Sequence, residues 1–138
     1  MINELRLSLP SAHTLVRPLR ESIKDWLARG PFASGLVDDV LLAASELFAN
    51  AVSSASEDSP IQVSLRTVGT SLILEVANEG LGFDLLLIPS PSPERSTGRG
   101  LAIVRTFGDL AVDQHEGRTF VRVTLPSAMT PTTLCTSP

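Results

Sequence analysis

ASELFANAV, residues 44–52, places two polar side chains in an apolar, helical pattern. Glu46 and Asn50 are four residues apart, so they are neighbours on one face of a helix. On a helical wheel that face lies beside Ala43 and Leu47, away from the expected buried stripe. Such a pair is typical of a solvated helix face. It also suits a carboxylate acting as general base beside an amide oxygen that ligates Mg²⁺, which prefers hard oxygen ligands.

The helix that carries this pair is predicted to follow Ser34. Asp38 and Asp39 are expected in its first turn, where the helix dipole favours negative charge. Apolar residues recur at helical spacing along it. The predicted buried stripe consists of Val37, Val40, Leu41, Ala44, Phe48 and Ala51.

Upstream of this helix, the pattern predicts one strand and one further helix. Residues 5–9 alternate apolar and polar, as a half-buried strand does. Ser11 is a candidate N-cap for a helix that runs to about Arg29. Pro18 lies inside that stretch, so the helix either begins late, near Arg17, with the proline in its first turn, or kinks there.

Downstream, two hairpins and a short helix are predicted. Residues 61–67 and 71–77 alternate around a short turn, and residues 110–115 and 119–125 do the same. Residues 101–107 are apolar and predict a short helix. This order predicts an α+β fold, a two-layer sandwich in which helices cover one face of a mixed, mostly antiparallel sheet.

Composition and charge narrow the class of protein. The chain has 138 residues, 43% of them hydrophobic and 19% charged, which fits one globular domain with its own core. The net charge of −4 disfavours a direct nucleic-acid partner, because neutralising phosphates needs a basic surface. The sequence carries neither a signal peptide pattern nor an apolar run long enough to cross a bilayer, so a cytoplasmic protein without membrane contact is expected.

Residue counts exclude several kinds of site. Lys24 is the only lysine, and no glycine-rich loop precedes it, which excludes P-loop NTPases and protein kinases of the eukaryotic type. Cys135 is the only cysteine, so neither an intramolecular disulfide nor a thiolate metal cluster is possible. Any phosphate binding must therefore use backbone amides, arginines and a metal ion.

Three glycine-containing segments are further candidates. In residues 78–82, NEGLG, two glycines directly after a strand let the backbone turn sharply and approach a flat ligand. Residues 98–100, GRG, lead into a helix, whose free amides form an anion site. Residues 117–119, GRT, precede the last strand. Taken singly, each is also an ordinary turn.

In this order and spacing, the four segments resemble the N-box, G1, G2 and closing elements of the GHKL ATP-binding superfamily. The short lid of residues 83–97 and GRGLAIVRTFGD, residues 98–109, are similar to the RsbW-like anti-sigma factors and switch serine kinases in particular. The resemblance covers roughly residues 2–126. We expect a GHKL ATP-binding kinase domain over residues 1–126 and a flexible C-terminal tail over residues 127–138.

The resemblance implies that the chain binds ATP with Mg²⁺ and is a serine/threonine protein kinase. Glu46 would be the catalytic base and Asn50 would hold Mg²⁺. The other implied ATP-binding residues are Asn78, Gly80, Gly82, Arg95, Thr97, Gly98, Arg99, Gly100, Leu101, Ala102 and Thr119. The implied partners are a STAS-domain anti-anti-sigma protein, which would be phosphorylated, a sigma factor or analogous regulator, and a second copy in a homodimer.

Two departures from the family pattern keep alternatives open. The G1 element usually begins with Asp, which accepts from the adenine amino group, and this chain has Asn78, whose amide oxygen accepts the same bond. Ser54 stands where relatives often carry His. The alternative is a binding module that kept the fold and lost kinase activity. A detached histidine kinase catalytic domain is disfavoured by the short lid and by the lack of a preceding phosphoacceptor helix.

Overall fold

The elements of the fold follow the predicted order closely. The computed structural model describes residues 4–54, 59–79 and 102–126, and every structural statement below concerns these residues. The elements are strand β1 (Glu4–Leu9), the 3₁₀ turn η1 (His13–Leu15), helices α1 (Val16–Ala28) and α2 (Ser34–Ser54), and strands β2 (Ile61–Val68), β3 (Ser71–Glu79), β4 (Asp109–His115) and β5 (Arg118–Pro126).

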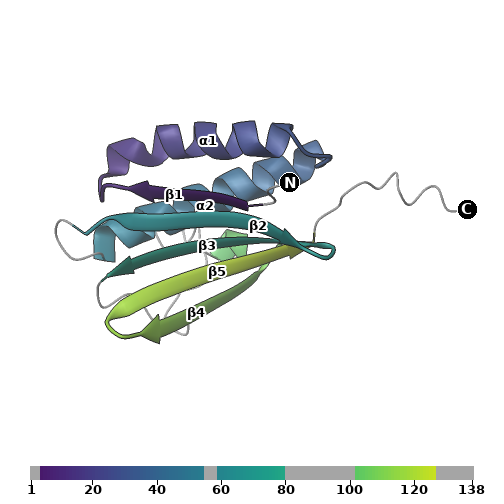
Figure 1. Ribbon diagram of the computed structural model, residues 1–138. Coiled ribbons are helices and arrows are strands. Elements are labelled where there is room, and N and C mark those ends of the chain that lie inside the picture. The colour runs from purple at the N-terminus through teal and green to yellow at the C-terminus, as the bar shows by residue number, and fades with distance from the viewer. Residues whose placement is uncertain (1–3, 55–58, 80–101, 127–138) are drawn as a thin grey trace, which may run out of the picture.

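The five strands form one sheet in the order β1-β2-β3-β5-β4. Each neighbouring pair in it is antiparallel. Figure 1 shows α1 and α2 together on one side of this sheet. The α+β fold class, a two-layer arrangement of helices on a largely antiparallel sheet, is therefore confirmed. Strand β3 pairs with β5 and not with β4, so the middle of the sheet joins segments that are distant in sequence.

Side chains alternate between the two faces of the sheet. The face toward the helices is apolar, and on β3 and β5 it carries Leu72, Leu74, Val76, Val121, Val123 and Leu125, all buried. The opposite face, called the outer face below, carries mainly polar and charged side chains. Its members include Arg6, Gln62, Ser64, Arg66, Glu75, Arg118, Phe120 and Arg122.

Of the two alternatives for helix α1, a late start near Arg17 or a kink at Pro18, the structure shows the late start. It starts at Val16, after the 3₁₀ turn, and Pro18 lies in its first turn, where backbone amides lack intrahelical acceptors in any case. The predicted Ser11 cap is wrong, because the N-cap position is Leu15 and no side chain caps the helix. Leu19, Ile23 and Leu27, at helical spacing along α1, are buried in the core.

Helix α2 is buried on a wider arc than the sequence pattern predicts. It packs against α1 on one side and against β2 and β3 on the other, so residues outside the predicted stripe also enter the core. Ala43 and Leu47, expected on the solvated side, are 0% and 2% exposed. The expectation that Asp38 and Asp39 lie in the first turn is also wrong, since the helix already begins at Ser34.

Both predicted hairpins are confirmed, with longer strands than expected. The turn between β4 and β5 consists of Glu116 and Gly117, whose φ angles of 51° and 76° are those of a type I′ turn. Strand β3 continues to Glu79, beyond the predicted end at residue 77, because Asn78 and Glu79 still pair with β5.

Only part of the remaining expectations falls on described residues. Residues 102–104 are helical and a turn follows to residue 107, which agrees with the predicted short helix. Val104 is fully buried in the core. The expected lid, residues 83–97, and the expected tail, residues 127–138, lie outside the described residues. None of the described helices is both long and apolar enough to cross a membrane.

Phe48 tests the packing between the two layers. It is the largest side chain of α2 in the core and is 0% exposed. We expect Phe48→Ala to lower the free energy of unfolding by about 3–5 kcal/mol, because it removes buried surface and leaves a cavity. Val68, which is 47% exposed, is the matched control. Val68→Ala is expected to change the free energy of unfolding by less than about 0.5 kcal/mol. Urea denaturation measures both. Equal effects would show that Phe48 does not pack as described.

Candidate functional site

Two buried polar residues face each other in the apolar layer. Among the described residues, the buried polar or charged side chains are Asn78, 2% exposed, and Thr119, 0% exposed. They are directly paired across β3 and β5. Both continue the core-facing rows of their strands, so they point toward the helices and not toward the outer face. A buried polar group is costly unless it is hydrogen-bonded, so such a pair at the edge of a core marks a candidate ligand site.

The amide of Asn78 makes a weak contact with its own strand. Its Nδ2 donates to the backbone oxygen of Glu79 at 3.4 Å. Protein N–H···O bonds centre near 2.9–3.0 Å, so this contact uses little of the donor capacity of the amide. The geometry therefore suits a ligand edge that offers a better acceptor.

Glu46 lies on α2 in a half-buried position. Burial removes water from its carboxyl group, which disfavours the charged form, and this desolvation raises the pKa of Glu46 above its ordinary value of 4.5. Its helix neighbours Ala43 and Leu47 are buried, so this side of α2 lies against the core. The expectation of a fully solvated face is thus wrong, and Glu46 has an environment that ordinary surface glutamates lack.

Asn50 is held against the helix that carries it. Its Nδ2 donates to the backbone oxygen of Glu46 at 2.8 Å. This bond fixes the orientation of the amide and directs its Oδ1 away from that carbonyl. One turn of α2 therefore carries both Asn50, with its amide oriented by this bond, and Glu46, whose pKa is raised.

The end of α2 and the buried polar pair lie at the same end of the sheet. Ser59, which follows α2 in the chain, donates from its Oγ to Oε1 of Glu79 at 3.1 Å. Glu79 is the strand neighbour of Asn78. Figure 1 shows the C-terminal end of α2, the end of β3 and the start of β5 together at this end of the molecule. Helix α2 also packs directly on β3. The structure therefore brings two of the sequence motifs to one region.

Sequence reasoning missed a contact that fastens α2 in place. Arg20 of α1 donates from Nη1 to Ser45 Oγ at 2.8 Å and to the backbone oxygen of Leu41 at 3.3 Å. Ser45 itself donates to Leu41 at 2.8 Å. Because Ser45 precedes Glu46, this network anchors the turn that bears the candidate base. A polar pair 25 residues apart leaves no periodic signal, so only the packing of α1 on α2 reveals it.

The other predicted site residues are placed only in part. Ala102 opens the helical turn of residues 102–104. The remaining glycine, arginine and lid positions lie outside the described residues, and they are Gly80, Gly82, Arg95, Thr97, Gly98, Arg99, Gly100 and Leu101. Their roles stay predictions.

The donor set constrains any metal ion. Within the described ranges, no group of three or more His, Cys, Asp or Glu side chains is placed to hold a metal. A single amide oxygen such as that of Asn50 fits Mg²⁺ only together with water and phosphate oxygens, which is how Mg²⁺ accompanies nucleotides.

Comparison with known proteins identifies the family. The family model described as "Histidine kinase-like ATPase domain" matches residues 9–125, and the chain belongs to this family. The fold of this chain and the segment that matches the family define a GHKL-type ATPase domain. No curated protein matches the chain in sequence.

Solved structures share the fold at low sequence identity. The RsbU and RsbW domains of Rv1364c from Mycobacterium tuberculosis are 18% identical, with a TM-score of 0.68 over 91% of this chain and 33% of that one. The catalytic domain of histidine kinase ThkA is 16% identical, with a TM-score of 0.56 over 91% of this chain and 97% of that one. The Acinetobacter baumannii histidine kinase AdeS is 14% identical, with a TM-score of 0.55 over 90% and 68% of the two chains. This chain spans about a third of the Mycobacterium tuberculosis chain.

The raised pKa of Glu46 predicts how stability depends on pH. A folded-state pKa above the ordinary 4.5 means that the folded protein holds the proton more tightly than the unfolded chain does. The wild type therefore loses stability as pH rises from about 4.5 through the folded pKa. Glu46→Gln removes this cost. We expect the melting temperature of the variant minus that of the wild type to be larger at pH 8 than at pH 4 in thermal scans. A difference that does not change with pH would contradict the desolvation of Glu46.

Proposed function

We propose that this chain is an ATP-dependent serine/threonine protein kinase that acts as an anti-sigma or partner-switching regulator. The observation that carries the ATP site is the buried pair of Asn78 and Thr119, paired across β3 and β5 beneath the helix layer. Membership of the histidine kinase-like ATPase family supports ATP as the bound nucleotide.

Adenine suits the chemistry of the buried pair. Its edge presents an amino donor beside ring-nitrogen acceptors, and an asparagine amide offers an acceptor oxygen and a donor nitrogen in return. The weak 3.4 Å contact of Asn78 Nδ2 leaves donor capacity for such a ligand. In this proposal Thr119 contributes a hydroxyl to the same polar layer. Gly80 and Gly82 would border the plane of the base.

Glu46 is proposed as the catalytic base. Its role would be to orient a serine or threonine hydroxyl of the substrate protein and to accept the proton as the γ-phosphoryl group is transferred. A general base works best when its pKa lies near the working pH, and desolvation moves the pKa of Glu46 upward toward that range. The Arg20–Ser45 network would hold this turn in register.

The phosphates and the metal ion need other groups. ATP would supply the phosphoryl group, and Mg²⁺ bound with it would be held by the Asn50 amide oxygen. With no lysine available beyond Lys24, we assign charge neutralisation to Arg95 and Arg99. The backbone of residues 98–102 would surround the phosphates, as helix N-termini after glycines commonly do.

The proposed partners are taken by analogy from one structural neighbour. The Mycobacterium tuberculosis structure contains RsbU and RsbW domains and has the highest TM-score of the three structures described. By analogy we propose a STAS-domain antagonist as the phosphorylated substrate, a sigma factor or analogous regulator as the client, and a homodimer as the working form. A sequence identity of 18% supports a shared fold alone. These partners are therefore part of the proposal and are to be tested by experiment.

One observation favours a second function. Asn78 replaces the aspartate expected at the start of the G1 element, and a neutral amide accepts the adenine amino hydrogen bond less strongly than a carboxylate does. A non-catalytic binding module with weakened nucleotide use is therefore the alternative. The Asn78 variants below separate the two functions.

Glu46→Gln tests the catalytic assignment. Loss of a general base typically lowers a rate by about 10²–10⁴-fold, so we expect phosphotransfer to fall by that factor while Mg-ATP affinity stays within a few-fold. The assay is transfer from labelled ATP to a STAS-domain protein of the same organism. Glu21→Gln, an exposed carboxylate on α1, is the control and should transfer normally. Unchanged transfer by Glu46→Gln would remove Glu46 from the mechanism.

Asn78 variants test the nucleotide site itself. Asn78→Ala leaves polar atoms of a buried base unpaired, which costs about 1–3 kcal/mol, or about 5- to 150-fold in ATP affinity. Asn78→Asp should preserve or strengthen binding, and GTP should bind poorly to all forms. Calorimetric titration measures these affinities, and thermal melts of the free variants check folding. ATP binding by Asn78→Ala at wild-type strength would disprove the adenine assignment, and binding seen only with Asn78→Asp would support the non-catalytic alternative.

A further inference from the structure

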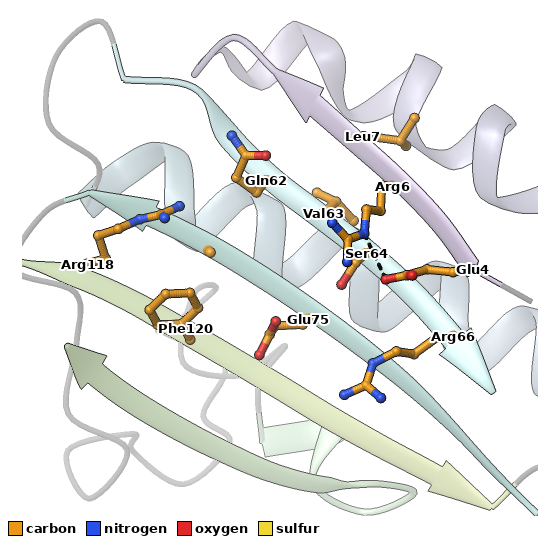
Figure 2. A pocket seen from close by; sticks show the side chains of 11 residues that line it. Glu4, Arg6, Leu7, Gln62, Val63, Ser64, Arg66, Glu75, Arg118 and Phe120 are labelled. Carbon is orange, nitrogen blue, oxygen red and sulfur yellow. Dashed lines mark hydrogen bonds and ion pairs between the residues drawn. The ribbon is translucent and has the colours of Figure 1, made fainter. Parts of the chain in front are cut away.

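The outer face of the sheet does not select a ligand by charge. It carries a hollow of about 560 Å³ in which arginines and carboxylates lie together (Figure 2). Glu4 accepts a hydrogen bond from Nε of Arg6 at 2.9 Å, and Glu75 accepts one from Nη2 of Arg122 at 3.2 Å. Charges of both signs offset each other on this face, so the features that point to a ligand are those of the helix-facing side.

On the helix-facing side, three neighbouring strands change from apolar to polar at the same level. One row across β3, β5 and β4 consists of Val76, Val121 and Val112. The next row in the same register consists of Asn78, Thr119 and Gln114. The buried pair of the nucleotide site therefore continues onto β4, and Gln114 is its direct neighbour there.

Strand alternation assigns Gln114 to this side of the sheet. Leu110 and Val112, which precede it at two-residue spacing on β4, pack against the core. Its chain neighbours Asp113 and His115 line a hollow on the outer face, and Gln114 borders that hollow too, since β4 is an edge strand. Alternate residues of a strand share a face, so Gln114 belongs to the polar row.

Figure 2 shows the same alternation on β5. Arg118 and Phe120 are directed to the outer hollow, and Thr119 between them lies on the opposite face. Neighbouring strands are about 4.8 Å apart, so the Cα atoms of Asn78 and Gln114 are separated by about 10 Å. Asn78 and Thr119 are buried, whereas Gln114 is exposed. Gln114 therefore stands at the solvent-accessible end of the row, within the span of a ligand that Asn78 holds.

We propose that Gln114 is a further binding residue of the nucleotide site, and that its carboxamide hydrogen-bonds to the nucleoside part of bound ATP. This inference rests on the ATP site proposed above and adds a residue of β4 to it. The valine row offers a nucleoside no side-chain hydrogen bond, so its polar atoms are satisfied from the polar row. A carboxamide both donates and accepts, which suits either the base or a ribose hydroxyl.

Calorimetric titration of the full chain with Mg-ATP tests this role. Gln114→Ala removes one hydrogen bond to the ligand, so we expect the affinity for ATP to fall by about 2- to 12-fold. His115→Ala is the matched control, because His115 is the exposed chain neighbour on the outer face, and it should bind ATP like wild type. Thermal melts check that both variants are folded.

A second nucleotide, 2′-deoxy-ATP, identifies the contacted group. An equal loss of affinity for ATP and 2′-deoxy-ATP in Gln114→Ala would support a contact with the base. A loss confined to ATP would support a contact with the ribose 2′-hydroxyl.

Two results would overturn the role of Gln114. The first is wild-type affinity for both nucleotides in Gln114→Ala, and the second is an equal loss in His115→Ala, which would indicate a disturbed hairpin. If Asn78→Ala weakens ATP binding and Gln114→Ala does not, only this inference fails. If the wild type does not bind ATP, the proposed ATP site fails together with it.

Discussion

The pairing of β3 with β5 is the constraint on which the rest of the structure depends. It joins two distant parts of the chain in the middle of the sheet and sets their register from Ser71 opposite Pro126 to Glu79 opposite Arg118. The same register places Asn78 opposite Thr119 on the face toward the helices. A shift by one residue would turn every side chain of β5 to the other face, exposing the apolar row and moving Thr119 out of the core. Burial of that apolar row therefore also determines that Asn78 and Thr119, the pair proposed to contact adenine, face the helices.

Helix α2 connects this sheet to the proposed chemistry. Because it packs on α1 and on the sheet at once, its Glu46 side lies against buried neighbours and not in open water. Desolvation raises the pKa of that carboxyl, which makes it a better base near neutral pH while it costs stability. Arg20 reaches across from α1 to Ser45 and ties the two helices together beside it. At Glu46 the raised pKa thus lowers stability while it favours the proposed catalytic role, and the packing of α2 on α1 and the sheet compensates for that loss of stability.

The two faces of the sheet differ in what they can bind. The helix-facing side ends in a buried, neutral polar pair that suits a flat heterocycle. The outer face carries arginines and carboxylates together, around a hollow lined among others by Glu4, Arg66, Glu75 and Arg118. Because side chains alternate between the faces of a sheet, one sheet with helices on one side presents two chemically different surfaces.

Much of this architecture was predictable from the sequence because it rests on local patterns. Period-two alternation located the strands, helical spacing located α1 and α2, and the order of short motifs around Glu46, Asn78 and the later glycines indicated the ATP-binding family. Local patterns also misled: they placed Ala43 and Leu47 in solvent and ended β3 before Asn78. Both errors have one cause, which is that burial depends on what packs from elsewhere in the chain. By itself the sequence determined the elements, their order and the family. Only the tertiary structure decided that Asn78 meets Thr119, that Glu46 is desolvated and that Arg66 and Arg118 flank one hollow, because each of these depends on contacts between residues far apart in the chain.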